Sequence, residues 1–171
     1  GDATDDFPLL HEAADQGRIA GDNAGRFPDV RASRRQSPFA IIFSDPQIVR
    51  VGDGHADLTA RGASFATGSV SFADQGRARV LGKNRGLLHV YGEHGTGRFL
   101  GAEMVAPAAE HLGHLLAWTL NAGRSVQAMR DSPFYHRCLE EGLRTALRDV
   151  SRALRMGPVP VPHCLDCGPG A

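Results

Sequence analysis

Residues 99–122 read FLGAEMVAPAAEHLGHLLAWTLNA, and within this stretch the apolar residues change from the spacing of a strand to that of a helix. Phe99–Val105 is predicted to be a β-strand. From Pro107 to Ala122 the apolar residues recur at helical spacing, with the proline in the first turn and Gly123 at the end. Because this helix is apolar on most of its circumference, we expect it to lie between a sheet and another surface.

The residues before this stretch predict a series of antiparallel strands with short connections. The apolar or alternating runs are Phe39–Phe43, Ile48–Val51, 68–72, 78–81 and Leu87–Tyr91. A glycine-rich turn at 92–97 should join the last of these runs to Phe99–Val105 as a hairpin. Residues 53–66 have no long apolar periodicity, and we expect only strand and loop there.

The residues after this stretch predict helices. A short helical turn is expected at 125–129, and residues 137–155 form the clearest amphipathic helix, with leucines along one stripe and arginines opposite. Strands followed by helices indicate an α+β fold in which the helices pack on one face of an antiparallel sheet.

The two ends of the chain differ from this central part. A helix is expected over about residues 8–20, and the polar, arginine-rich segment 25–37 is the natural place for a domain boundary. From Gly157 onward the sequence is rich in proline and glycine, which predicts an extended or disordered tail. We therefore divide the chain into 1–36, 37–156 and 157–171.

The composition excludes several classes of partner. Nineteen basic residues balance nineteen acidic ones, so no basic excess exists for nucleic acid or an anionic membrane. No apolar run approaches the length of a membrane span, and no signal segment is visible. Three cysteines suit a reducing compartment, and we expect a soluble, cytoplasmic protein. Because the chain opens on Gly1 directly before a helix, we expect a fragment of a longer polypeptide.

Residues 132–141, SPFYHRCLEE, combine an imidazole with two carboxylates near a helix start. A histidine that is neutral near pH 7 can remove a proton from an incoming group and return it, and a carboxylate on its other nitrogen fixes the tautomer. Helical spacing favours Glu140 as the partner of His136. If His136 precedes the helix, that rule does not apply, and spacing does not choose between Glu140 and Glu141.

Three passages taken in order resemble the C-terminal part of the pyridine nucleotide-disulfide oxidoreductases, the flavoprotein family of dihydrolipoyl dehydrogenase and glutathione reductase. They are Gly1-Asp2 with Leu9-Leu-His11, then Phe43-Ser-Asp-Pro-Gln-Ile48, and finally Phe99–Val105 followed by the apolar helix, Phe134-Tyr-His136 and Glu141. The resemblance covers about residues 1–150. Each passage alone is a weak signal, but their order is specific.

The resemblance implies a fold and a set of roles. Residues 37–156 would form the dimerisation domain, and 1–36 would be the end of an FAD-binding domain. Asp2, Leu9, Leu10 and His11 would contact FAD, with the helix start directed at the flavin. His136 would act as acid/base at the redox disulfide of the partner subunit in a homodimer, and the family register makes Glu141 its partner.

The same resemblance implies parts that this sequence does not contain. It has no Cys-x4-Cys motif and no convincing Gly-x-Gly-x-x-Gly after a strand, so the redox disulfide and the NAD(P) site would lie elsewhere. The chain alone would be inactive, and neither its disulfide or dithiol substrate nor the choice between NADH and NADPH can be read from it. Arg137 also stands where the family usually has proline, which could mean a different substrate, an impaired enzyme or a tolerated variant.

Several other residues leave alternatives open. Cys138 could be a thiol activated by a helix start, but a buried filler is the preferred interpretation. His111 and His114 are spaced for a metal but lack a third ligand, so no metal site is predicted. Cys164 and Cys167 beside His163 could form a redox relay or half of a zinc site, or have no function. The alternatives to the main hypothesis are a non-catalytic dimerisation module and a mercuric or thioredoxin reductase that uses these tail cysteines.

Overall fold

The protein is described by a computed structural model that covers residues 2–4 and 8–155. Its centre is a five-stranded sheet with the order β1-β2-β5-β4-β3, in which every neighbouring pair is antiparallel. The strands are β1 (Phe39–Ile42), β2 (Gln47–Gly52), β3 (Phe65–Ser71), β4 (Leu87–Glu93) and β5 (Phe99–Ala106). The predicted hairpin is confirmed, since β4 and β5 pair along most of their length.

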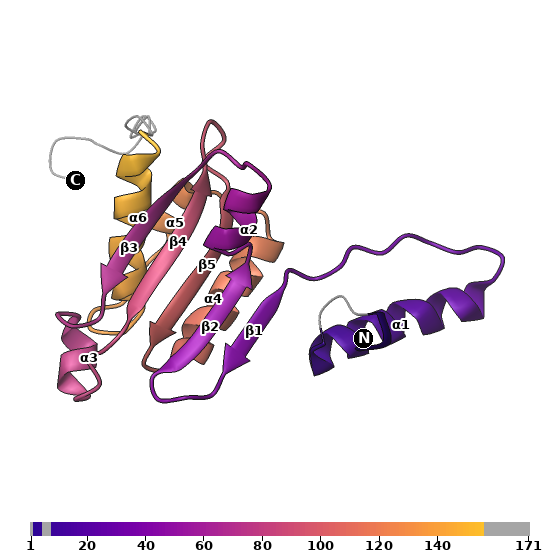
Figure 1. The fold of residues 1–171 in the computed structure, drawn as a ribbon, viewed down its shortest axis with the longest axis horizontal. Coiled ribbons are helices and arrows are strands. Elements are labelled where there is room, and N and C mark those ends of the chain that lie inside the picture. Colours follow the sequence, from indigo (N-terminus) through magenta and orange to yellow (C-terminus); the bar gives the residue numbers. More distant parts are fainter. Residues whose placement is uncertain (1, 5–7, 156–171) are drawn as a thin grey trace, which may run out of the picture.

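Helices cover one face of this sheet (Figure 1). They are α4 (Ala109–Asn121), α5 (Val126–Arg130) and α6 (Glu141–Ala153), and all three lie behind the strands in the view of Figure 1. The short α2 (His55–Ala60) packs instead at one end of the opposite face, where Leu58 contacts Tyr91 and Leu100. The predicted α+β fold, with an antiparallel sheet and its main helices on one side, is therefore confirmed.

The main core lies between the sheet and these three helices. Alternate residues of the central strands point toward the helices, where they meet the apolar stripes of α4 and α6. The fully buried members include Leu88, Val90, Ala102, Leu112, Leu116, Leu143 and Leu147. The stripe on α6 has the spacing predicted from the sequence, with buried residues at positions 143, 146, 147 and 150.

Helix α6 approaches β3 unusually closely at Gly68. A Cβ atom at that position would lie 2.3 Å from both the Ala146 carbonyl oxygen and the Val150 nitrogen. Only a residue without a side chain lets the helix backbone rest on the strand at this point. This contact fixes α6, and therefore the residues immediately before it, relative to the sheet.

The first helix, α1 (Leu10–Arg26), is six residues longer at its end than predicted and begins two residues later. Ion pairs between residues three and four apart, Arg18–Asp15 and Arg26–Asp22, support the part of the helix that contains the glycines. Residues 27–38 then form neither helix nor strand, in agreement with a connecting segment. Figure 1 shows α1 beside the β1 edge of the sheet rather than on a face of it.

Two short helices replace predicted strand or loop. Residues 53–66 contain α2, whose first turn is closed by the Asp57 side chain accepting from the Gly54 N–H at 2.9 Å. Residues 78–81 belong largely to α3 (Gly76–Val80), which is capped by the Gln75 side chain. In each case one polar side chain satisfies the helix start, and a search for apolar periodicity does not detect this.

The two long C-terminal helices both begin later than the sequence predicts. Helix α4 begins at Ala109 rather than at Pro107, after Ala108 in the left-handed conformation. Helix α6 begins at Glu141 rather than at residue 137. The Glu141 N–H donates to the Cys138 carbonyl and the Gly142 N–H to the Leu139 carbonyl, each three residues back, so the segment before Glu141 forms a turn rather than an α-helix.

The outer side of α4 is open in this chain. Trp118 is 69% exposed and Leu115 is 41% exposed, although both lie on a largely apolar helix. The expectation that α4 lies against a second surface is therefore not met within the described residues. Among those same residues, no helix is long and apolar enough to cross a membrane.

Candidate active site

The structure brings His136 and Glu141 together. His136 lies in the loop before α6 and Glu141 is the first residue of that helix, and their Nδ1 and Oε1 atoms are 3.0 Å apart. Helical spacing pointed to Glu140, but His136 precedes the helix, so that rule does not apply. Glu140 instead lies beside Cys138.

The charges and hydrogen bonds around His136 define its tautomer. The hydrogen bond from His136 holds the pKa of Glu141 below its usual range, so the carboxylate is ionised near neutral pH and can only accept. Nδ1 must therefore carry the proton, which leaves a lone pair on Nε2. Arg137 Nε donates to that atom at 3.1 Å, in agreement with the assignment. In this tautomer Nε2 is the basic atom of the His136 ring.

This pair borders an open groove of about 460 Å³. The groove lies between the end of β3, the segment leading into α3 and the start of α6. The His136 side chain is 71% exposed, whereas that of Glu141 is 31% exposed. The imidazole can therefore meet a reactant arriving from outside this chain while its carboxylate partner stays behind it.

Cys138 does not contribute to this groove. It lines a different cavity, of about 550 Å³, formed by α4, α5, α6 and the loop before α6. Burial, together with a hydrogen bond involving Glu140, raises the pKa of the Cys138 thiol. The idea of a thiol activated in the first turn of a helix is wrong, because α6 begins three residues later and the pKa moves the other way.

The proposed flavin-contacting residues lie at the start of the chain. Asp2 belongs to a single 3₁₀ turn, η1 (Asp2–Thr4), while Leu9, Leu10 and His11 surround the start of α1. No side chain caps that start, and Leu10 is 88% exposed. The first N–H groups of α1 therefore have no side-chain cap, and the flavin role of this segment stays a prediction.

The start of α1 lies apart from the acid/base pair. The His11 ring lies 6.4 Å from the ring of Phe39 in β1, at the edge of the sheet. His136 contacts Glu141 and Arg137, both in its own part of the chain. Within the described residues the two sets of candidate residues therefore do not form one site.

The histidines of α4 are packed or solvent-exposed. His114 Nδ1 lies 2.7 Å from the Glu110 carbonyl, and its ring packs edge-on against Phe39 with centroids 4.9 Å apart. The side chain of His111 is exposed. Over residues 2–4 and 8–155, no three His, Cys, Asp or Glu residues are grouped to hold a metal ion. His163, Cys164 and Cys167 lie outside the described residues.

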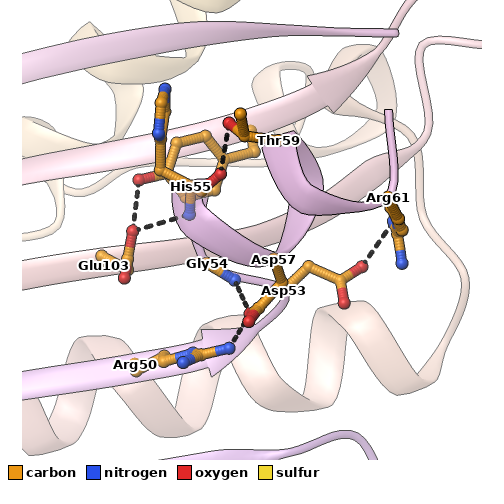
Figure 2. Close-up of polar contacts among 9 residues, drawn as sticks. Arg50, Asp53, Gly54, His55, Asp57, Thr59, Arg61 and Glu103 are labelled. Carbon is orange, nitrogen blue, oxygen red and sulfur yellow. Dashed lines mark hydrogen bonds and ion pairs between the residues drawn. The ribbon is translucent and has the colours of Figure 1, made fainter. Parts of the chain in front are cut away.

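A polar cluster on the opposite face of the sheet was not anticipated (Figure 2). Glu103 Oε2 accepts from the His55 N–H at 2.9 Å and from the buried Tyr91 hydroxyl at 2.6 Å. Arg50 pairs with Asp57, the residue that closes the first turn of α2. Figure 2 shows these side chains fastening α2 to the end of the sheet, so the cluster explains why a helix forms there. The spacing of Gly54 and Asp57 was the sequence signal for it.

Burial and charge act in opposite directions within this cluster. Burial, reinforced by the hydrogen bond to Glu103, raises the pKa of Tyr91, so its hydroxyl stays protonated and donates. Burial alone would raise the pKa of Glu103, but the His55 N–H, the Tyr91 hydroxyl and Arg50 together hold it below its usual range. The cluster is a satisfied anchor rather than a second reactive site.

Comparison with known proteins agrees with this architecture. Residues 39–147 match the pyridine nucleotide-disulphide oxidoreductase dimerisation domain. The chain is 30% identical to dihydrolipoyl dehydrogenase of Haloferax volcanii, over 88% of this chain and 31% of that protein. It is 28% identical to mercuric reductase of Acidithiobacillus ferrooxidans, over 91% of this chain and 28% of that protein. The chain thus spans less than a third of these relatives.

Solved structures show the same relationship. LpdA from Mycobacterium tuberculosis superposes with a TM-score of 0.75 at 26% identity, over 86% of this chain and 32% of that one. The Cu(II) complex of the HOCl-induced flavoprotein disulfide reductase RclA from Escherichia coli superposes with a TM-score of 0.74 at 25% identity, over 86% of this chain and 34% of that one. The fold and the matched residues together show that this chain belongs to the pyridine nucleotide-disulphide oxidoreductase family, through its dimerisation domain.

Proposed function

We propose that this chain is the C-terminal part of an FAD-dependent NAD(P)H:disulfide oxidoreductase, most like dihydrolipoyl dehydrogenase. In this proposal the chain supplies the dimer interface and the acid/base pair His136–Glu141 for thiol–disulfide exchange. One observation carries it: a member of this family holds an exposed imidazole 3.0 Å from an ionised carboxylate, at the edge of an open groove.

The geometry suits a proton transfer between sulfur and nitrogen. As one thiol of a dithiol substrate attacks the redox disulfide, its proton passes to Nε2 of His136, while one sulfur–sulfur bond forms and another breaks. Glu141 stabilises the resulting imidazolium through Nδ1. Arg137 must release Nε2 before a thiol can reach it. His136 can then return the proton to the departing cysteine thiolate.

The remaining parts of the enzyme would come from outside this chain. The redox disulfide would belong to the partner subunit of a homodimer, and the NAD(P) site to another domain. FAD would supply electron transfer between the redox disulfide and NAD(P). Asp2, Leu9, Leu10 and His11, all within residues 1–36, would contact it. Residues 37–156 would form the dimerisation domain and 157–171 a tail. The isolated chain would have no turnover.

A second candidate rests on the tail. Mercuric reductase of Acidithiobacillus ferrooxidans is about as similar to this chain as the dihydrolipoyl dehydrogenase is, and Cys164 and Cys167 form a Cys-x-x-Cys motif. In that case the tail cysteines would carry electrons or Hg(II) between the redox disulfide and the solvent. Replacing both with serine in the intact protein would then abolish turnover, whereas the main proposal predicts little change.

The main proposal is tested by His136→Gln in the intact polypeptide that carries this chain. Loss of the base should lower the rate of dithiol oxidation by about 10²- to 10⁴-fold. His94→Gln is the matched control, since His94 is exposed in the β4–β5 turn. An intact protein without redox cysteines or disulfide reductase activity would instead favour a non-catalytic dimerisation module.

A further inference from the structure

A side-chain hydrogen bond joins the loop that carries His136 to the segment between β3 and α3. Among the described contacts of residues 133–140, most are local, such as the Cys138 thiol to the Tyr135 carbonyl at 2.7 Å. Phe134 and Leu139 pack against the main core, and a distant side-chain hydrogen bond comes from Gln75, which lies 63 residues before Cys138 in the chain. This side chain reaches the loop from the segment between β3 and α3.

Gln75 uses both ends of its amide. Its Oε1 accepts from the Ala78 N–H at 2.7 Å, and its Nε2 donates to the Cys138 carbonyl at 2.7 Å. The orientation of the amide is unambiguous, because an N–H must face oxygen and a carbonyl must face the NH₂ group. The residue is only 9% exposed, so neither hydrogen bond is readily replaced by water.

The position of the second hydrogen bond matters for the acid/base pair. Cys138 lies between His136 and Glu141, two residues after the first and three before the second. The Cys138 carbonyl also accepts from the Glu141 N–H at 3.4 Å, so Gln75 holds the turn that leads directly into α6. Gly142, the second residue of α6, packs closely against Phe72, because a Cβ atom at position 142 would lie 3.3 Å from the buried phenyl ring.

We propose that Gln75 is a positioning residue for the His136–Glu141 pair. By holding the Cys138 carbonyl, it fixes where the loop ends and the helix begins, and so sets the separation of the imidazole from its carboxylate. Gln75 lines the same groove but acts through the loop rather than on the reactant. This inference rests on the proposed function, in which that pair performs acid/base chemistry.

The chain offers a variant that separates the two roles of Gln75. In Gln75→Glu the carboxylate still accepts from the Ala78 N–H and keeps the cap of α3, but at pH 8 it has no proton to donate to Cys138. Asn84→Asp is the matched control. Asn84 Nδ2 donates to the Ala73 carbonyl at 2.8 Å in the same region, and this bond does not touch the loop.

The first readout is NMR of the 171-residue chain and needs no activity. In the unmodified chain we expect slow exchange of the Gln75 side-chain amide protons, and imidazole nitrogen shifts that place the His136 proton on Nδ1. Gln75→Glu should move the His136 shifts toward a mixture of tautomers, whereas Asn84→Asp should leave them in place. Fast exchange of the Gln75 amide protons, or unchanged His136 shifts in a folded Gln75→Glu chain, would overturn the inference.

The second readout uses the intact enzyme at pH 8. Misplacing the base should lower kcat by about 10- to 100-fold with little change in KM, because both ends of the Gln75 amide bond to the protein itself rather than to a reactant in the groove. Asn84→Asp should retain full turnover. If Gln75→Glu shifts the His136 resonances but neither it nor His136→Gln affects turnover, the positioning role holds and the proposed function fails. If His136→Gln is inactive while a folded Gln75→Glu matches wild type in both readouts, the positioning role fails alone.

Discussion

His136 has polar partners on both ring nitrogens, and this arrangement defines how it can react. Glu141 accepts from Nδ1, and Arg137 donates to Nε2 where the family usually has proline. Proline could not make such a contact, so in the proposed reaction the Arg137 side chain would have to leave Nε2 before a thiol arrives. The fixed positive charge it adds would then lie beside the attacking thiolate, which it stabilises.

A testable prediction concerns Glu103, in the polar cluster that holds α2 against the sheet. Its pKa is depressed in the folded protein, so its stabilising effect is fully present above the ordinary value of 4.5 and is lost as pH falls through the folded-state value. Glu103→Gln keeps the shape but not the charge. We expect it to lower the free energy of unfolding by about 1 kcal/mol at pH 7.

Urea unfolding of both proteins at pH 7 and at pH 3.5 measures this difference. The gap between wild type and Glu103→Gln should narrow at the lower pH, because below 4.5 the Glu103 carboxyl of the unfolded chain binds a proton while the folded protein, with its lowered pKa, disfavours this proton. A gap that stays constant, or widens, as the pH falls would show that the charge of Glu103 does not stabilise the fold. Asp74→Asn, at a carboxylate whose side chain is 97% exposed, controls for the general effect of removing one carboxylate.

At the scale of elements, the contact between α6 and β3 determines where the acid/base loop lies. Gly68→Ala should lower the free energy of unfolding by about 2–4 kcal/mol, because the new methyl group would overlap the backbone of α6. Gly76→Ala is the matched control, since nothing lies within 4 Å of its Cβ position. Chemical denaturation of the 171-residue chain gives both values. Equal stabilities for the two variants would contradict the close packing of α6.

The elements that could be predicted from the sequence are those with enough apolar residues to show a period. The β4–β5 hairpin and α6 were predicted because their apolar residues repeat a strand or helix spacing over several positions. The short helices α2 and α3 could not be predicted this way, because they depend on Asp57 and Gln75 satisfying their first N–H groups. These caps are hydrogen bonds between residues three positions apart, and a search for apolar periodicity does not detect them.

The candidate site, like the fold, could be predicted from the sequence only in part. His136 could be singled out from its neighbours and from the family pattern, but spacing alone could not choose between Glu140 and Glu141. That choice depends on the residue at which α6 begins, and the buried amide of Gln75 affects it from 63 residues away. Gln75 itself gave no sequence signal, because a glutamine before a short apolar run is ordinary.

At the scale of the whole molecule, the outer side of α4 is the expected self-association surface. It exposes Leu115 and Trp118 in a domain whose family match is a dimerisation domain. We expect the intact protein to sediment as a dimer and Trp118→Lys to shift it toward monomer. Val80→Lys is the matched control, because Val80 is exposed on α3, away from α4. A dimer that is unaffected by Trp118→Lys would place the interface on another face.

Mixed dimers of the intact protein test whether His136 serves the redox disulfide of the partner subunit. One subunit carries His136→Gln, and the other keeps His136 but has serine in place of the redox cysteines, so neither homodimer is active. If His136 serves the disulfide of its partner, an equal mixture should regain about a quarter of wild-type turnover, because half the dimers then contain one complete site. A mixture that stays inactive, although mass measurement shows that mixed dimers form, would contradict the account.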